Sequence, residues 1–239
     1  ASKAWVALLP GSRQREVHLN LPTMLEAMTV LGNVYQYVLP VAPTVDRASV
    51  AAMISSASPG KAKPEPVLVD DARAALYHAR ASIVASGTAT VEAALLGNPF
   101  VVVYRLSRLS YAIARRVVTV PHVAMANLIA DRRVVPELIQ DEFTAEAVVA
   151  AMRPLLANGP QREAAIAGLR EVRQRLDTQG EGNAIDRVAS ICVELLTDRS
   201  SQSSNPVESS GTIPSPGTLS AETPGETAPS VEPAGTYRS

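Results

Sequence analysis

A short turn near the N-terminus carries the residue types that bind phosphate. Gly11, Ser12 and Arg13 follow the apolar run 5–9 and precede a segment of helical period. Glycine permits a tight turn, the first N–H groups of a helix attract anions, and an arginine there can hold a phosphate oxygen. Alternatively, Ser12 caps the helix and Arg13 is solvated. Arg13 and Arg15 both oppose the helix dipole, and a bound anion would compensate them.

A second turn, rich in hydroxyl groups, follows the apolar run 82–85. Its candidate binding residues are Ser86, Gly87, Thr88, Thr90 and Glu92. Small residues let a ligand approach the backbone, hydroxyls can contact phosphate, and a carboxylate one turn into a helix can accept hydrogen bonds from ribose hydroxyls. Alternatively, Ser86 or Thr88 caps the helix and Glu92 is an exposed polar residue. Neither turn has the glycine spacing of dinucleotide folds or P-loops, which disfavours NAD enzymes and P-loop NTPases.

An arginine-rich segment follows the apolar run 100–104. On a helix, its four arginines would fall within an arc of about 100° beside an apolar stripe. They are Arg105, Arg108, Arg115 and Arg116. A basic amphipathic helix can lie on an anionic membrane surface or face a phosphorylated ligand. Alternatively, it is a core helix with a solvated arginine face.

Metal and nucleophile chemistry have little support in the sequence. The histidines at 18, 78 and 122 lack metal-ligand spacing, and Ser86 is not in a G-x-S-x-G elbow. Cys192 lies between apolar residues of helical period, so we expect a core thiol. We expect neither a metal ion nor another cofactor.

Short apolar runs alternate with helical segments through most of the chain. Strands are expected at 5–9, 35–39, 67–69, 82–85 and 100–104, and helices at 13–31, 45–57, 71–79, 89–96 and 107–119. Continuous apolar strands indicate a sheet covered on both faces, and this order favours an α/β, Rossmann-like doubly wound parallel sheet. Both candidate turns then lie at the carboxyl edge of the sheet, where ligands bind.

Composition divides the chain into a folded part and a tail. Residues 1–198 predict one domain with a helical block at 144–196, and the Ser/Pro/Thr-rich residues 199–239 predict a disordered tail. The 239 residues include 22 Lys and Arg, 23 Asp and Glu, and one Cys, which excludes bulk-charge binding to nucleic acid and an internal disulfide. No apolar run is long enough to span a bilayer, and the cysteine usage predicts a reducing, cytoplasmic compartment.

A series of motifs extends through residues 4–196. They are Leu8-Leu9-Pro10-Gly11-Ser12-Arg13, Asn20-Leu21-Pro22, Ala85-Ser86-Gly87-Thr88-Ala89-Thr90-Val91-Glu92-Ala93-Ala94-Leu95, Val102-Val103-Tyr104-Arg105, Asn127-Leu128-Ile129-Ala130 and Val135-Pro136-Glu137-Leu138-Ile139-Gln140. In this order they resemble the lipid-A-disaccharide synthases. The resemblance implies the C-terminal, nucleotide-sugar-binding domain of a GT-B type glycosyltransferase. Such an enzyme joins UDP-2,3-diacylglucosamine to 2,3-diacylglucosamine 1-phosphate, releases UDP and forms the lipid A disaccharide.

The resemblance also implies roles for the candidate residues. Arg13 would contact the diphosphate, the turn at 86–90 would supply hydroxyl and amide donors, and Glu92 would hold the ribose. The later motifs add Asn127, Arg132 and Glu137 as donor-site candidates. Helix N-termini and arginine would stabilise the leaving group without an obligatory metal. Because both substrates carry acyl chains, the arginine-rich segment would contact the cytoplasmic face of the inner membrane of a Gram-negative-type bacterium.

The resemblance covers only about half of the expected enzyme. The chain begins at Ala1 without a methionine, so we expect an excised or incomplete gene product that lacks the N-terminal domain. That domain would hold the acceptor site and the general base, and the chain alone is expected to bind UDP without turnover. Two alternatives stay open. One is another UDP-sugar GT-B enzyme or a UDP-sugar epimerase, and the other is a non-catalytic nucleotide-binding module that forms a homodimer through 144–196.

Overall fold

The computed structural model describes residues 3–57, 64–106, 122–177 and 188–195, and the chain divides into two compact units. The first unit is Ala1–Glu181 and the second is Gly182–Ser239. In the second unit, residues 188–195 are helical and exposed. Cys192 is exposed like every other described residue of its helix, so the expected core thiol is wrong. The expected helix at 107–119 and the expected tail at 199–239 lie outside the described residues.

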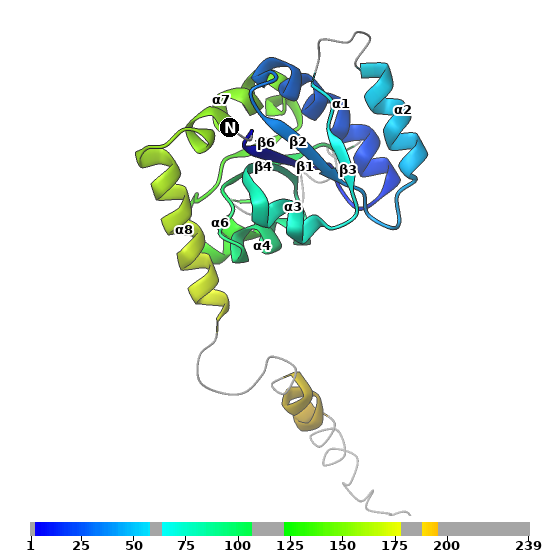
Figure 1. The fold of residues 1–239 in the computed structure, drawn as a ribbon. Helices are drawn as coiled ribbons and strands as arrows, with labels where there is room; N and C mark the ends of the chain where they lie inside the picture. Colours follow the sequence, from blue (N-terminus) through cyan, green and yellow to red (C-terminus); the bar gives the residue numbers. More distant parts are fainter. Residues whose placement is uncertain (1–2, 58–63, 107–121, 178–187, 196–239) are drawn as a thin grey trace, which may run out of the picture. The chain divides into compact units, whose positions relative to one another are not determined.

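The first unit is built around a parallel sheet of six strands (Figure 1). The strands are β1 (Trp5–Leu9), β2 (Gln36–Pro40), β3 (Val67–Val69), β4 (Ala79–Ala85), β5 (Phe100–Tyr104) and β6 (Glu137–Ile139). Their order is β3-β2-β1-β4-β5-β6, and every neighbouring pair is parallel. This order is typical of a doubly wound sheet whose switch point lies between β1 and β4. The predicted α/β fold is confirmed.

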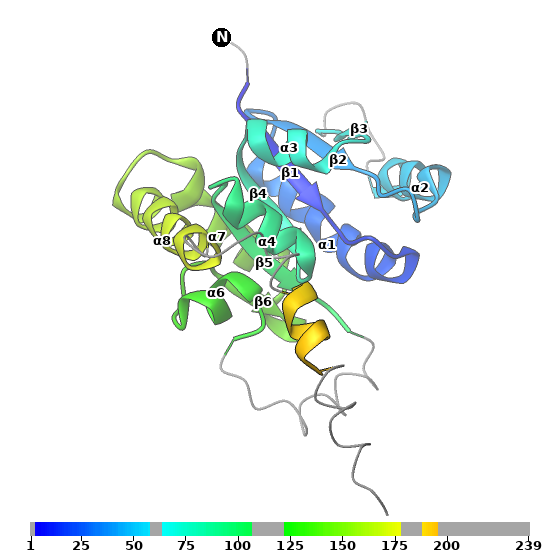
Figure 2. The same cartoon turned by 90° about the horizontal axis from the view of Figure 1, so that it is seen from below.

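Helices connect the strands and cover both faces of the sheet (Figures 1 and 2). They are α1 (Gln14–Leu31), α2 (Arg47–Ala57), α3 (Ala72–His78), α4 (Thr88–Leu95), α6 (Met125–Ala130), α7 (Ala145–Leu156) and α8 (Pro160–Leu176), with a 3-10 turn η1 (Gln140–Glu142). Residues of α1, α2 and α7 share one buried cluster, and residues of α3, α4 and α6 share the other. Helix α8 packs against α4 and α6. Among the described residues, no helix is long and apolar enough to cross a membrane.

The alternation of side chains along β1 explains why the sheet is buried on both sides. Val6 and Leu8 belong to one buried cluster, and Ala7 and Leu9 belong to the other. Successive side chains of a strand point to opposite faces, so a continuous apolar run can serve two cores. The expected strands and the helices between them are confirmed with nearly the same bounds, apart from the expected helix at 107–119. Helix α6 and strand β6 were not expected from the sequence.

Candidate functional site

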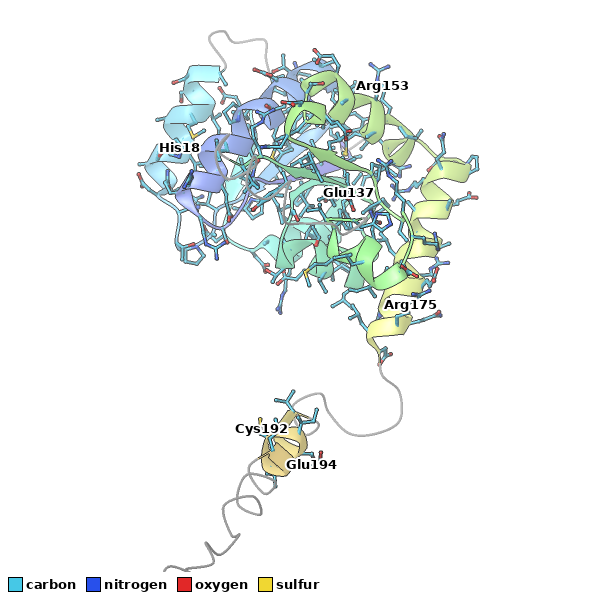
Figure 3. The ribbon with its side chains drawn as sticks, turned by 180° about the vertical axis from the view of Figure 1, so that it is seen from behind. His18, Glu137, Arg153, Arg175, Cys192 and Glu194 are labelled. Atoms are coloured by element: carbon cyan, nitrogen blue, oxygen red, sulfur yellow. The ribbon has the colours of Figure 1, made fainter. Side chains whose placement is uncertain are left out.

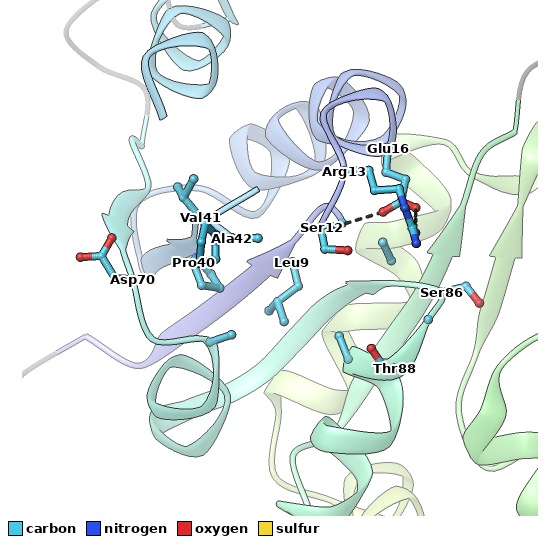
Figure 4. A pocket seen from close by; sticks show the side chains of 16 residues that line it. Leu9, Ser12, Arg13, Glu16, Pro40, Val41, Ala42, Asp70, Ser86 and Thr88 are labelled. Atoms are coloured by element: carbon cyan, nitrogen blue, oxygen red, sulfur yellow. Dashed lines mark hydrogen bonds and ion pairs between the residues drawn. The ribbon is translucent and has the colours of Figure 1, made fainter. Parts of the chain in front are cut away.

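A pocket of about 430 Å³ opens at the carboxyl edge of the sheet, beside the switch point between β1 and β4 (Figure 4). Residues at the ends of four strands line it: Leu9, 11–13 and Glu16 after β1, 40–43 after β2, Asp70 and Ala72 after β3, and 85–89 after β4. Both predicted turns therefore meet in one pocket. The loop at 40–43 and the residues Glu16, Asp70 and Ala72 were not predicted as part of the site.

The turn between β1 and α1 needs a glycine at position 11. Gly11 has a φ of +133°, a conformation that side chains with a Cβ rarely adopt. A Cβ placed there would lie 2.6 Å from the Glu16 Cβ and 2.7 Å from its Oε2. The alternative in which Ser12 caps the helix is wrong, because Arg13 occupies the N-cap and the Ser12 backbone N–H donates to Glu16 Oε2 at 3.1 Å.

Glu16 also holds the side chain of Arg13. The Arg13 Nη1 donates to Glu16 Oε1 at 2.9 Å, and the two side chains are 78% and 24% exposed. Figure 4 shows both contacts of the Glu16 carboxylate as dashed lines. Glu16 is the third residue after the N-cap Arg13. A glutamate is common at this position, because its carboxylate can accept hydrogen bonds from the free N–H groups at the start of the helix. This spacing was the signal in the sequence that could have identified Glu16.

Contacts from two directions fix the turn. The buried Asn20 on α1 donates from Nδ2 to the Pro10 carbonyl at 2.9 Å. On the opposite side, the Thr44 hydroxyl donates to the Ser12 carbonyl, and Gln14 Oε1 accepts a hydrogen bond from the Asp46 N–H at 3.1 Å. These hydrogen bonds hold the turn at 10–13 in one conformation, and a turn fixed in this way would lose little entropy on binding a ligand.

The turn between β4 and α4 contributes three of its five predicted residues to the pocket. Ser86, Gly87 and Thr88 line it, and Gly87 is the N-cap of α4. Thr90 is buried and donates its hydroxyl to the Gly87 carbonyl at 2.6 Å, so it stabilises the turn from within. Glu92 is half-buried one turn further along α4 and is not among the residues that line the pocket.

Asn127 belongs to a buried hydrogen-bond network outside the pocket. Its Oδ1 accepts from the backbone N–H groups of Val134 and Val135 at 2.7 and 2.9 Å. Its Nδ2 donates to the Val135 carbonyl at 2.9 Å and to Glu137 Oε1 at 2.7 Å. These four hydrogen bonds satisfy both donors and both acceptor sites of the Asn127 amide within the protein. Asn127 therefore positions the loop before β6.

Glu137 completes the same network at the start of β6. Its carboxylate accepts hydrogen bonds from the N–H groups of Val123 and Ala124, both at 3.0 Å. Figure 3 shows Glu137 among the packed elements of the first unit. The residue therefore ties the entry to α6 to the sheet, and its carboxylate already has three donors.

Arg132 links the loop after α6 to the outer helix α8. Its guanidinium pairs with Glu171, which also accepts from Arg175 at 2.7 Å. The hydrogen bond from Arg132 is the main cause that lowers the pKa of Glu171. Arg175 is labelled on α8 in Figure 3. Neither Arg132 nor this cluster lines the pocket.

Arg105 contacts the protein itself. Its guanidinium donates to Thr23 Oγ1 at 3.0 Å and to the Phe143 carbonyl, and it stacks 4.8 Å from the centre of the Phe143 ring. Arg105 is half-buried and joins the end of β5 to α1 and to the start of the α7 region. The other three arginines expected at a membrane, Arg108, Arg115 and Arg116, lie outside the described residues.

We predict that Gly11→Ala destabilises the chain. The new methyl group would overlap Glu16, and the backbone would keep a conformation that disfavours alanine, so we expect a loss of about 1–3 kcal/mol in the free energy of unfolding. Thermal denaturation followed by circular dichroism measures it. Gly97→Ala is the control, because Gly97 also has a positive φ of +68° but open space around it. Equal losses in both variants would show that contact with Glu16 contributes nothing.

Residues 1–190 match the family described as lipid-A-disaccharide synthetase. The chain belongs to the lipid-A-disaccharide synthase family. The synthase of Acidobacterium capsulatum is 59% identical over 211 residues, which cover 84% of this chain and 52% of that protein. The synthase of Koribacter versatilis is 46% identical over 177 residues, which cover 74% and 46%. The chain thus spans about half the length of these lipid-A-disaccharide synthases.

Solved glycosyltransferases share the fold of this lipid-A-disaccharide synthase family member. The spinosyn rhamnosyltransferase SpnG, solved with thymidine diphosphate, matches with a TM-score of 0.51 at 15% identity. The match covers 80% of this chain and 46% of SpnG. The predicted GT-B type fold is therefore confirmed.

Proposed function

We propose that the pocket binds the UDP part of UDP-2,3-diacylglucosamine and that the chain is the donor half of a lipid-A-disaccharide synthase. The observation that carries the proposal is the meeting of Gly11, Ser12 and Arg13 with Ser86, Gly87 and Thr88 in one pocket. Doubly wound sheets bind nucleotides at this edge. The diphosphate in the SpnG complex supports a nucleoside diphosphate as the ligand class.

In this proposal, the pocket stabilises UDP as the leaving group. Arg13 supplies a guanidinium, and the backbone around the N-termini of α1 and α4 supplies N–H donors, which favour the negative charge that develops on the diphosphate. Glu92 remains the proposed ribose-binding residue. Its carboxylate makes no hydrogen bond to the part of the chain that the structure describes. Asn127, Arg132 and Glu137 would act through the fold instead of contacting UDP.

The acceptor is proposed to be 2,3-diacylglucosamine 1-phosphate, and the reaction a direct displacement at the anomeric carbon. The acceptor hydroxyl must lose a proton, and the two pocket carboxylates, Glu16 and Asp70, are already paired with Arg13 and Arg47. We therefore propose that the base belongs to the half of the relatives' length that this chain does not match. The acylated substrates suggest a peripheral position on the cytoplasmic face of the inner membrane, and the helical block suggests a homodimer. Vesicle co-sedimentation and the mass in solution test these two points.

Two measurements together test the proposed function: competition between sugar donors for binding, and transfer of the sugar to the acceptor. We expect the 239-residue chain to bind UDP and UDP-2,3-diacylglucosamine, to prefer the acylated donor over UDP-N-acetylglucosamine, and to form no disaccharide from the two purified substrates. Competition calorimetry and a radiolabelled transfer assay measure the two properties. Equal affinity for the non-acylated sugar would favour another UDP-sugar enzyme. Turnover close to that of a full-length relative would contradict the assignment of the base.

A further inference from the structure

Glu16 is the pocket carboxylate that contacts the turn at 10–13. It lines the pocket, and its two oxygens hold the Ser12 N–H and the Arg13 guanidinium, at 3.1 and 2.9 Å. These two groups are the donors that the proposed function assigns to the diphosphate. A carboxylate and a phosphate group both bind such donors through anionic oxygens.

The geometry leaves little freedom for Glu16 while it makes these contacts. Its Cβ and Oε2 pack against the Cα of Gly11, because an added Cβ there would lie within 2.7 Å of each. Its side chain is only 24% exposed, whereas Arg13 is 78% exposed. The arginine can therefore turn towards a ligand in solvent, but a ligand that takes the Ser12 N–H must displace the carboxylate.

We infer that Glu16 competes with the diphosphate for the Ser12 N–H and the Arg13 guanidinium and thereby sets how tightly the diphosphate is held. It holds the turn at 10–13 in a conformation ready for binding, and it exchanges its two contacts with the ligand. Its negative charge lowers the affinity for the diphosphate, and its return to the two donors favours release of UDP after transfer. This inference rests on the proposed function, because it concerns the same pocket.

Competition by a carboxylate acts on phosphates and not on the nucleoside. Glu16→Gln keeps an oxygen that can accept from Ser12 but removes the charge that pairs with Arg13. We therefore expect this variant to bind UDP and inorganic pyrophosphate about three- to tenfold more tightly, with slower dissociation of UDP. Binding of uridine should stay unchanged. If Glu16 only supported the turn, its substitution would instead weaken the binding of all three ligands.

Calorimetry with UDP, pyrophosphate and uridine on the 239-residue chain measures these affinities, and stopped-flow measures UDP dissociation. Glu26→Gln is the matched control, since Glu26 lies exposed on the same helix and outside the pocket. Glu16→Ala serves as a second variant if the first does not fold. Unchanged or weaker UDP binding in a folded Glu16 variant would overturn this inference and leave the proposed function intact. Failure of the unaltered chain to bind UDP would overturn the proposed function as well.

Discussion

Replacing Arg13 by alanine is expected to weaken UDP binding by about ten- to a hundredfold. Among the residues that the structure describes, Arg13 is the one arginine that lines the pocket, and hydrogen bonds to charged groups contribute about 1.5–3 kcal/mol. The loss should fall on the diphosphate, so uridine should bind the variant and the unaltered chain equally. Calorimetric titration of the 239-residue chain with both ligands measures the effect.

Arg15→Ala is the matched control for this variant. Arg15 is also exposed in the first turn of α1, but it does not line the pocket. Removing it takes away the same charge from the same helix end, so it corrects for the general electrostatic contribution. If the affinity for UDP falls by the same factor in both variants, Arg13 attracts UDP only through net charge and does not contact the diphosphate.

Asn127→Ala is expected to cause the largest loss of stability, about 2–4 kcal/mol. The side chain is fully buried and takes part in four hydrogen bonds, two as acceptor and two as donor. Removing it leaves the N–H groups of Val134 and Val135 without partners, and each such buried group costs about 1–3 kcal/mol. Chemical denaturation followed by circular dichroism measures the change in the free energy of unfolding.

Arg133→Ala provides the comparison, because Arg133 is exposed in the same loop. We expect it to change the stability by less than about 0.5 kcal/mol. Below its unfolding temperature, the Asn127 variant should bind UDP with nearly unaltered affinity, since the network lies outside the pocket. A folded Asn127→Ala chain of normal stability that loses UDP binding would show instead that Asn127 contacts the ligand.

Much of the fold could be predicted because central strands such as β1 and β5 are continuous runs of apolar residues in the sequence. A run such as 100–104 is buried on both faces, so no other element type explains it as well. Strand β6 escaped prediction because it is a short edge strand of three half-buried residues that begins with Glu137. Helix α6 has only 6 residues, which is too few for a repeated helical pattern to be recognised. Both are specified by tertiary contacts, through the Asn127 network, more than by local pattern.

The site was predictable where it depends on strand order and not where it depends on long-range packing. Gly11, Arg13 and Ser86 were identified because strand-to-helix turns of a parallel sheet lie at its carboxyl edge, where ligands bind. The loop at 40–43 contains no chemically distinctive residue, and only the position of β2 beside β1 brings it to the pocket. Glu16 has an ordinary place in a first helical turn, and its role depends on the bend at Gly11.

Polar residues in matching motifs were harder to interpret from the sequence. Asn127, Glu137 and Arg105 have side chains that can bind a ligand, a membrane or the protein's own backbone, and composition does not distinguish these partners. In the structure, all three satisfy buried or half-buried groups of the chain. Such residues hold elements of the fold in place, and none of the three lines the pocket.

Hydrogen exchange of the 239-residue chain with and without UDP tests most directly whether this pocket is the donor site. The amides of residues 11–14 and 86–90 belong to the two turns that meet in the pocket, whereas α7 packs elsewhere on α1 and the sheet. We predict that saturating UDP slows exchange in both turns and leaves α7 unchanged. Unchanged exchange in both turns at saturating UDP, or protection confined to another part of the chain, would contradict the account.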